Sequence, residues 1–315
     1  MKNILAIYYT QSGQLKNILD SVISPIAKEH NVDIDFLQLK PQNDYPFPWG
    51  DEFFNCMPES VNCIPCKMQP YTIDNNKNYD LIILAHQPWY LSPSIPVTSF
   101  LASKEARALL KGKNVITIIG ARNMWVGAQE KIKQRLLEIN ARLTGNIVFQ
   151  DRVDNIIAGF TIIKWLIHGN KGPYRFLPEA GVSAKDISKG YVFGEIILDS
   201  LKTNDFENLQ LKLIQKKAVK VKYHLVNMEI KARKIFCKFA DLAIKCEKDS
   251  GLRRDKVIRL FKGYLLFALF FISPFVSVLF MVLRIALFPF ANKKINYYKN
   301  ITLNNRLSRD VTVSK

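Results

Sequence analysis

A short polar loop near the start of the chain has the composition of an anion-binding site. The loop Thr10–Gly13 (TQSG) follows an apolar run, Ile4–Tyr9, and precedes a segment in which apolar residues recur with helical spacing. Hydroxyl groups and a glycine at a helix N-terminus present free backbone N–H groups and the positive end of the helix dipole. The loop therefore predicts either phosphate binding or an ordinary strand-to-helix turn with a serine N-cap.

Two further loops carry aromatic and polar side chains where apolar runs end. The run Tyr79–Ala85 is followed by the sequence HQPWYLSPSIP, and the run Asn114–Gly120 is followed by ARNMW. Aromatic faces and backbone N–H groups suit a flat aromatic cofactor. The alternative is proline-rich turn chemistry with aromatics that close the core. Three such loops on one edge of a sheet favour the cofactor.

The first loop also resembles the FMN phosphate loop of flavodoxins, which runs hydroxyl-x-hydroxyl-Gly. FMN ends in a single phosphate, which suits a short loop without a metal, and no metal ligand is expected. The expected cofactor-binding residues are Thr10, Gln11, Ser12, Gly13, Gln14, Leu15, Pro88, Trp89, Tyr90, Gly120, Arg122, Asn123, Met124 and Trp125.

The elements that must position these loops alternate between strand and helix patterns. Further strands are predicted at Val32–Leu39 and Asn146–Phe149, and helical patterns lie at 97–110 and 125–140. This alternation predicts a flavodoxin-like α/β fold, a doubly wound sheet of five parallel strands. Ligands bind at the carboxyl ends of the strands in such folds.

The predicted flavin domain spans residues 1–203 and contains a long insertion at 41–78. This flap is rich in proline and aromatic residues, which suits a lid over an apolar substrate or a contact between two copies in a homodimer. It also contains Cys63 and Cys66. A single C-x-x-C in a loop is weak support for redox or zinc chemistry.

Nearly all the basic excess lies in the last third of the chain. Residues 206–315 hold 23 Lys and Arg against seven Asp and Glu, whereas residues 1–205 hold 22 against 20. One long basic helix is predicted at 206–247, because its apolar residues recur by threes and fours. Two interpretations remain open: a helix on an anionic membrane surface and the seam of a dimeric coiled coil.

An apolar segment at 264–290 identifies a membrane as the partner of this basic region. Residues Tyr264–Leu283 contain no charge over 20 positions, about the length that a helix needs to cross a bilayer. We therefore expect 206–262 and 264–290 to contact an anionic membrane, with 291–315 as a basic tail, and no nucleic-acid partner. Basic residues on both sides leave a transmembrane helix and a re-entrant segment open. The start of the chain has no signal-peptide pattern, which predicts a catalytic domain on the cytoplasmic face of the inner membrane.

Several longer motifs together resemble one family. YYTQSGQL, the PFPW of the flap, HQPWYLSPSIPV, GARNMWVGAQEK and EAGVSAKDISKGYVFG are similar to the flavodoxin-like family of dialkylresorcinol condensing enzymes, over residues 1–202. The resemblance implies a role in the biosynthesis of dialkylresorcinols, as in flexirubin-type pigments. The flavin motifs suit an aromatase step, in which a dialkyl cyclohexanedione is oxidised to a resorcinol.

Three residues are the candidate catalytic groups for that step. His86 and Tyr90 are candidates for proton transfer, and Arg122 for steadying the reduced flavin or an enolate oxygen. For His86, a hydrogen-bonded loop histidine without a catalytic role is the alternative. Other functions stay open: a membrane-associated NAD(P)H:quinone reductase, and a membrane-tethered flavodoxin that only carries electrons. The electron acceptor is not predicted.

Overall fold

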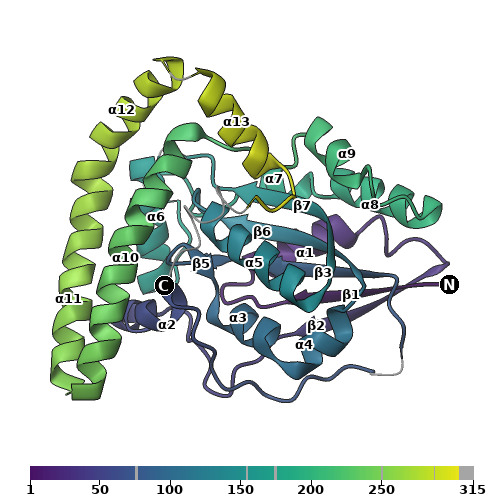
Figure 1. Ribbon diagram of the computed structural model, residues 1–315, viewed down its shortest axis with the longest axis horizontal. Coiled ribbons are helices and arrows are strands. Elements are labelled where there is room, and N and C mark those ends of the chain that lie inside the picture. Colours follow the sequence, from purple (N-terminus) through teal and green to yellow (C-terminus); the bar gives the residue numbers. More distant parts are fainter. Residues whose placement is uncertain (75–76, 154, 174–175, 250, 287, 305–315) are drawn as a thin grey trace.

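The computed structural model describes residues 1–304 apart from 75–76, 154, 174–175, 250 and 287 (Figure 1). Five parallel strands form one sheet in the order β2-β1-β3-β6-β7. Their bounds are β1 Lys2–Tyr8, β2 Val32–Gln38, β3 Leu81–His86, β6 Asn114–Ala121 and β7 Arg142–Gln150. This is the flavodoxin-like order, so the predicted doubly wound α/β fold is confirmed.

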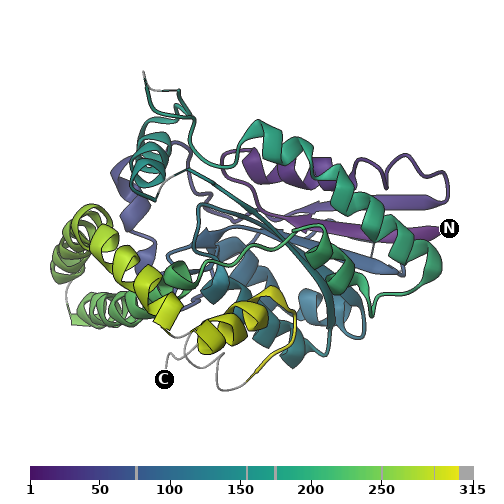
Figure 2. The same ribbon diagram turned by 90° about the horizontal axis from the view of Figure 1, so that it is seen from above.

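Alternation along each strand divides the core into two layers. Ile4, Ala6 and Tyr8 of β1 face one cluster, and Leu5 and Ile7 face the other. The first layer is covered by α1 Gln14–Ile23, α8 Tyr191–Thr203 and α9 Leu209–Gln215. The second is covered by α3 Ile95–Ala102, α4 Lys104–Leu110 and α5 Val126–Ile139. Figure 2 shows these layers on opposite sides of the sheet.

Shorter elements lie around the carboxyl ends of the strands. They are the 3-10 helix η1 Gly50–Phe54, α2 Met57–Val61, the strands β4 Pro88–Trp89 and β5 Ser92–Pro93, α6 Asn155–His168 and α7 Ala184–Ser188. The helix predicted at 97–110 is two helices, because Ser103 ends α3 and its Oγ accepts the Ala106 N–H as the N-cap of α4.

The single helix predicted at 206–247 is wrong. Helix α9 ends at Gln215, and α10 begins at Tyr223 and runs to Asp249. Between them the chain follows the outer edge of β7, where the Val148 N–H donates to the Ala218 carbonyl. The lysines of 216–222 therefore belong to the globular domain rather than to an amphipathic helix. This hydrogen bond pairs a backbone N–H at the open edge of the sheet. The helical spacing of the apolar residues did not reveal the pairing.

The apolar segment forms one long helix in three parts. Helix α11 (Gly251–Phe267) continues through a π-helical turn, η2 (Ala268–Ile272), into α12 (Ser273–Ala286). The π turn stands directly before Pro274, whose missing N–H and ring disrupt regular α hydrogen bonding. The helix packs against α10 along its length, so the seam predicted for α10 is covered within the same chain (Figures 1 and 2).

The predicted tail at 291–315 is wrong in its first part. Residues Phe288–Lys299 form α13, which returns to the globular domain. Tyr298 is buried, and the Tyr297 hydroxyl donates to Glu130 of α5 over 2.6 Å. Residues 305–315, and residue 287 within the predicted membrane segment, lie outside the described residues.

Candidate functional site

The loop between β1 and α1 presents an uncapped helix N-terminus. Gly13 is the N-cap of α1 at φ 81, a left-handed conformation that glycine adopts without strain, and no side chain caps the helix. The hydroxyl of Thr10 is buried and makes no hydrogen bond within the part of the chain that the structure describes. Ser12 lines a cavity beside this loop. An anion at this position would satisfy both the hydroxyl and the helix N–H groups.

Two glutamines fix this loop instead of facing an anion. The Gln14 amide donates to the Val182 carbonyl over 3.1 Å and accepts the Val182 N–H over 3.0 Å. The Gln11 amide donates to the Pro46 carbonyl over 3.0 Å, which joins the flap to the loop. Both residues also line the cavity. Their amides therefore hold its walls, and the backbone and hydroxyls are left for a phosphate.

The loop after β3 is a tight hairpin in an unusual conformation. Tyr90 and Leu91 stand at φ 47 and 64, so two consecutive residues with side chains adopt the left-handed region. Non-glycine residues in this region carry strain and cluster at functional sites. Trp89 is held by edge contacts to Trp49 and Tyr45, with ring centroids 4.8 and 5.0 Å apart. This packing supports the hairpin, and the centroid of the Tyr90 ring lies 5.1 Å from that of Phe53 and 5.9 Å from that of Phe261.

Two neighbouring cavities meet at this hairpin. The first, of about 170 Å³, lies between the Thr10–Gly13 loop, the hairpin and α6. The second, of about 250 Å³, lies between the hairpin and the C-terminal helices. They share four lining residues: Phe53, Pro88, Tyr90 and Arg122. Because the shared residues come from the flap and from both predicted ring loops, the loops meet where the fold predicts a ligand.

The Arg122 side chain is a half-buried cation at this junction. Burial lowers the pKa of Arg122 to about 10, while the nearby Asp151 carboxylate acts in the opposite direction. Burial also raises the pKa of Asp151. A guanidinium with a pKa near 10 stays charged at neutral pH, so the junction holds a fixed positive charge. Such a charge stabilises an anion that forms within hydrogen-bonding reach.

Tyr90 keeps its proton at this junction. Its hydroxyl donates to the Phe53 carbonyl over 2.7 Å, and burial raises its pKa well above the usual value. A phenol that remains protonated can donate a hydrogen bond, but it cannot act as a general base near neutral pH. Because its single proton is donated to the Phe53 carbonyl, the Tyr90 hydroxyl joins the hairpin to the flap.

The proposed proton transfer by His86 is wrong. His86 is fully buried, and its Nε2 lies 3.2 Å from the Gln129 amide oxygen. Burial lowers its pKa to about 4, so the ring stays neutral, and it lines neither cavity. The alternative interpretation, a hydrogen-bonded histidine without a catalytic role, fits this position because the last residue of β3 faces α5.

The loop after β6 divides its residues between cavity and core. Gly120 and Arg122 line the first cavity, and Asn123 and Met124 line the second. Trp125 lines neither cavity: it is 2 % exposed and packs in the core as the N-cap of α5, so a ring contact from Trp125 is wrong. The alternation of side chains along β6 ends before these residues. Their spacing in the sequence therefore did not show which of them line a cavity and which lie in the core.

Sequence reasoning missed several residues of the site. From the flap, Trp49 and Phe53 reach the cavities, and Trp165 and Gly181 close the first one from α6 and the following loop. A Cβ at Gly181 would lie 2.6 Å from the Gln14 amide oxygen, so this loop needs glycine. The outer wall of the second cavity comes from the C-terminal helices, through Met228, Ala232, Phe236, Tyr264, Leu265, Ala268, Leu269 and Ser273.

The two cysteines of the flap do not act as a pair. The Cys63 thiol lies 3.1 Å from the Lys131 ammonium, whereas Cys66 contacts Ser99 and Met68. Both are free thiols. No group of three or more His, Cys, Asp and Glu residues that could hold a metal ion occurs among the residues that the structure describes.

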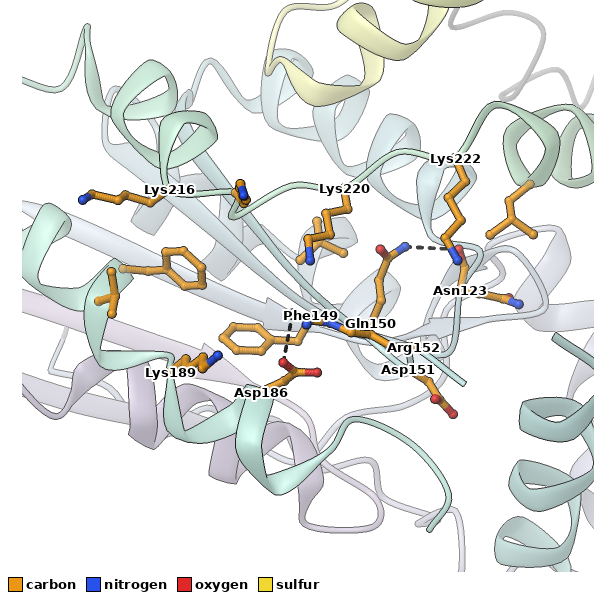
Figure 3. Close-up of a pocket in the computed structure, with 15 residues that line it drawn as sticks. Asn123, Phe149, Gln150, Asp151, Arg152, Asp186, Lys189, Lys216, Lys220 and Lys222 are labelled. Carbon is orange, nitrogen blue, oxygen red and sulfur yellow. Dashed lines mark hydrogen bonds and ion pairs between the residues drawn. The ribbon is translucent and has the colours of Figure 1, made fainter. Parts of the chain in front are cut away.

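A third and larger pocket, of about 440 Å³, is strongly basic (Figure 3). It lies beside the carboxyl end of β7, between the segment 216–222 and α7–α8. Phe149 and Phe193 contribute to its apolar part, and Asn123 joins it to the second cavity. Its cations are Arg152, Lys189, Lys216, Lys217, Lys220 and Lys222. Arg152 pairs with Asp186 over 2.9 Å, which leaves a positive excess suited to a phosphorylated ligand.

Comparisons with known proteins give only fold-level likeness. No family model matches the chain, and no curated protein matches it. A flavoprotein from Lactobacillus acidophilus NCFM, solved in complex with FMN, is 16% identical with a TM-score of 0.37, covering 52% of this chain and 99% of its own. A flavodoxin from the domain Archaea is 14% identical with a TM-score of 0.36, covering 64% and 99%.

A flavone reductase is 13% identical with a TM-score of 0.35, and the match covers 64% of this chain and 63% of its own. The assignment of the fold rests on the strand order and not on these likenesses. The order of the strands and the loops at their carboxyl ends define the chain as a flavodoxin-like α/β protein with an added C-terminal helical layer.

Proposed function

We propose that this protein is an FMN-dependent oxidoreductase that acts on a lipophilic substrate at the cytoplasmic face of the inner membrane. The observation that carries the proposal is the junction of two different cavities at Tyr90 and Arg122. One cavity adjoins a loop suited to a phosphate, and the other is walled by apolar side chains of the C-terminal helices. This arrangement suits a mononucleotide on one side and an alkyl-bearing substrate on the other.

The residues present fit FMN. Thr10, Ser12 and the N-terminus of α1 would hold its phosphate, because a buried hydroxyl and uncapped N–H groups are available there. Pro88 and Tyr90 of the hairpin and Arg122 would contact its ring. When bound, FMN supplies two-electron oxidation chemistry.

The substrate that we propose is a dialkyl cyclohexanedione, which the enzyme would convert to a dialkylresorcinol as in flexirubin-type biosynthesis. The motif resemblance supports this choice, and the apolar second cavity is compatible with an alkyl chain. The Arg122 cation would stabilise an enolate oxygen of the ring. The Tyr90 hydroxyl, whose single proton is donated to the Phe53 carbonyl, would hold the flap against the hairpin. The walls of both cavities would exclude water from the rings of the flavin and the substrate.

The test uses the full-length protein purified in detergent. Heat-released cofactor is identified by mass, and the bound flavin is then mixed anaerobically with a dialkyl cyclohexanedione. The proposal predicts loss of the visible flavin absorbance together with one equivalent of resorcinol. A protein that never holds flavin contradicts the flavin assignment, whereas bound flavin that the dione does not reduce contradicts only the substrate.

The basic pocket favours a second candidate, a membrane-associated NAD(P)H:quinone reductase. Its six cations suit the phosphates of a pyridine nucleotide, and Asn123 joins the pocket to the second cavity. We expect NADPH-dependent quinone reduction under this function, and an increase of at least about tenfold in the KM for NADPH in Lys220→Glu/Lys222→Glu. Absence of NADPH oxidation by the flavin-loaded protein would exclude it.

A further inference from the structure

The long helix α11–η2–α12 has two different apolar faces. Its outer face carries a row of exposed side chains, which we call the apolar stripe: Leu260, Phe267, Phe271, Phe275, Val278 and Val282. From Phe267 onward these residues recur by threes and fours over one side of the helix, and Leu260 lies two turns earlier. Phe275 is 77% exposed and Phe271 62%, so the stripe is not covered by any described part of this chain. The inner face packs on α10 and forms a wall of the second cavity.

The two ends of this helical layer return to the same globular domain. At one end, the Glu229 carboxylate of α10 accepts the Gly127 N–H over 2.6 Å. At the other, the Lys133 ammonium donates to the Asn300 carbonyl over 2.9 Å, and the Gln210 amide donates to the Lys299 carbonyl over 2.7 Å. If α11–α12 alone crossed a bilayer, α13 and the domain would lie on opposite sides. These bonds require both on one side.

The charges on the neighbouring helix give the same answer. By length alone, the uncharged part Tyr264–Leu283 would fit a hydrocarbon core about 30 Å thick, since 20 residues extend roughly 30 Å. Helix α10 lies alongside it and carries charged residues throughout, including the exposed Lys231, Lys234 and Lys238. A bilayer cannot surround this pair without burying those charges in lipid.

We propose that the apolar stripe lies in the plane of one leaflet of an anionic bilayer, and that alkyl chains enter the second cavity from that leaflet. Arg253, Lys256 and Arg259 are exposed beside the start of the stripe and would meet lipid phosphates. The cavity lies on the inner side of the same helix, where Leu265 and Leu269 face it while Phe267 and Phe271 face outward. The π turn lies at this position, and π turns occur frequently at functional sites.

The in-plane orientation of the helix does not depend on the proposed function. The binding of an alkyl chain in the second cavity, which we call the alkyl-chain seat, does depend on it. The first experiment therefore measures depth alone. Leu260→Trp, Phe271→Trp and Val282→Trp are each placed in the full-length protein on vesicles of phosphatidylcholine and phosphatidylglycerol, and quenching by lipids brominated at different depths is recorded. The four native tryptophans are at most 7 % exposed, so brominated lipids should quench them little and the baseline of quenching should be low. We expect one shallow depth for all three positions.

Two results would overturn the orientation. A deep Phe271→Trp with shallow flanking positions would indicate a spanning helix, and no quenching at any position would indicate no membrane contact. A flotation assay provides the control. Phe275→Ser/Val278→Ser/Val282→Ser should weaken vesicle binding at least about tenfold. Leu137→Ser should not, because Leu137 is equally exposed but lies on α5 near the amino ends of the strands.

The second experiment tests the seat. Leu265→Trp narrows the second cavity, and it should weaken the binding of a dodecylresorcinol at least about tenfold more than that of unsubstituted resorcinol, measured by titration in nanodiscs. Equal effects on both ligands would overturn the seat. This binding measurement needs no turnover, so failure of the oxidoreductase assay with normal chain-dependent binding contradicts the proposed function and leaves the seat intact.

Discussion

The hydroxyl of Thr10 is buried without a partner in the described part of the chain, which costs free energy unless a ligand bonds to it. We expect Thr10→Val to weaken FMN binding about tenfold, because one hydrogen bond to an anion is lost. Titration of the apo-protein with FMN measures the effect. The control is the thermal unfolding temperature of the apo-protein, which should be unchanged or slightly higher in the variant. An unaltered dissociation constant would show that this hydroxyl does not face the phosphate.

Glu229 joins α10 to the N-terminus of α5 through a buried carboxylate. Burial raises its pKa from 4.5 to about 7, even though the Gly127 and Val126 N–H groups favour the charged form. Since the folded-state pKa lies above the unfolded value, its stabilising effect is complete below pH 4.5 and is lost as pH rises through about 7.

We therefore expect the stability difference between the wild type and Glu229→Gln to change with pH. From pH 5 to 8 the wild type should lose about 3 kcal/mol relative to the variant, because ionisation of the buried carboxyl is unfavourable. Denaturant unfolding at a series of pH values measures this difference. A constant difference would show that Glu229 stays ionised throughout.

Helices α1 and α8 approach each other closely at a glycine. A Cβ at Gly194 would lie 1.9 Å from the Val22 carbonyl, a backbone atom that cannot move aside cheaply, whereas a Cβ at Gly263 of α11 meets nothing within 4 Å. Gly194→Ala should therefore destabilise the protein by about 3 kcal/mol or more. Gly263→Ala should stabilise it by about 0.5–1 kcal/mol, because alanine favours the helix. Chemical denaturation measures the free energy of unfolding of both variants. Similar changes in the two would contradict the close packing of α1 and α8 at Gly194.

At the scale of the whole molecule, a buried ion pair connects α13 to the sheet domain. The Lys133 ammonium lies 2.8 Å from Glu130, whose other oxygen accepts the Tyr297 hydroxyl. Lys133→Met should destabilise the protein by about 3–5 kcal/mol, since it leaves a buried carboxylate without its partner. Lys133→Met/Glu130→Gln should recover much of this loss in the same unfolding assay. An additive double variant would show that the pair is not coupled.

The site could be predicted in part because its loops follow recognisable strands. The apolar runs placed the loops after β1, β3 and β6 at one edge, where Tyr90 and Arg122 line both cavities. The direction in which each side chain points could not be predicted from the sequence in the same way. His86 and Trp125 lie in those loops or beside them, yet both face the core. His86 contacts Gln129 of α5, and Trp125 packs in the cluster of the first layer.

By itself, the sequence determined the parallel sheet, the position of the polar turn after β1 and the lipophilic character of the last third, because periodicity and turn chemistry depend on near neighbours. Only the tertiary structure decided how that last third is arranged. The segment 216–222 pairs with β7, Glu229 bonds to α5, and α13 returns to Glu130, each across a long sequence separation. Such contacts form where the folded chain brings the groups together, and local spacing carries no record of them.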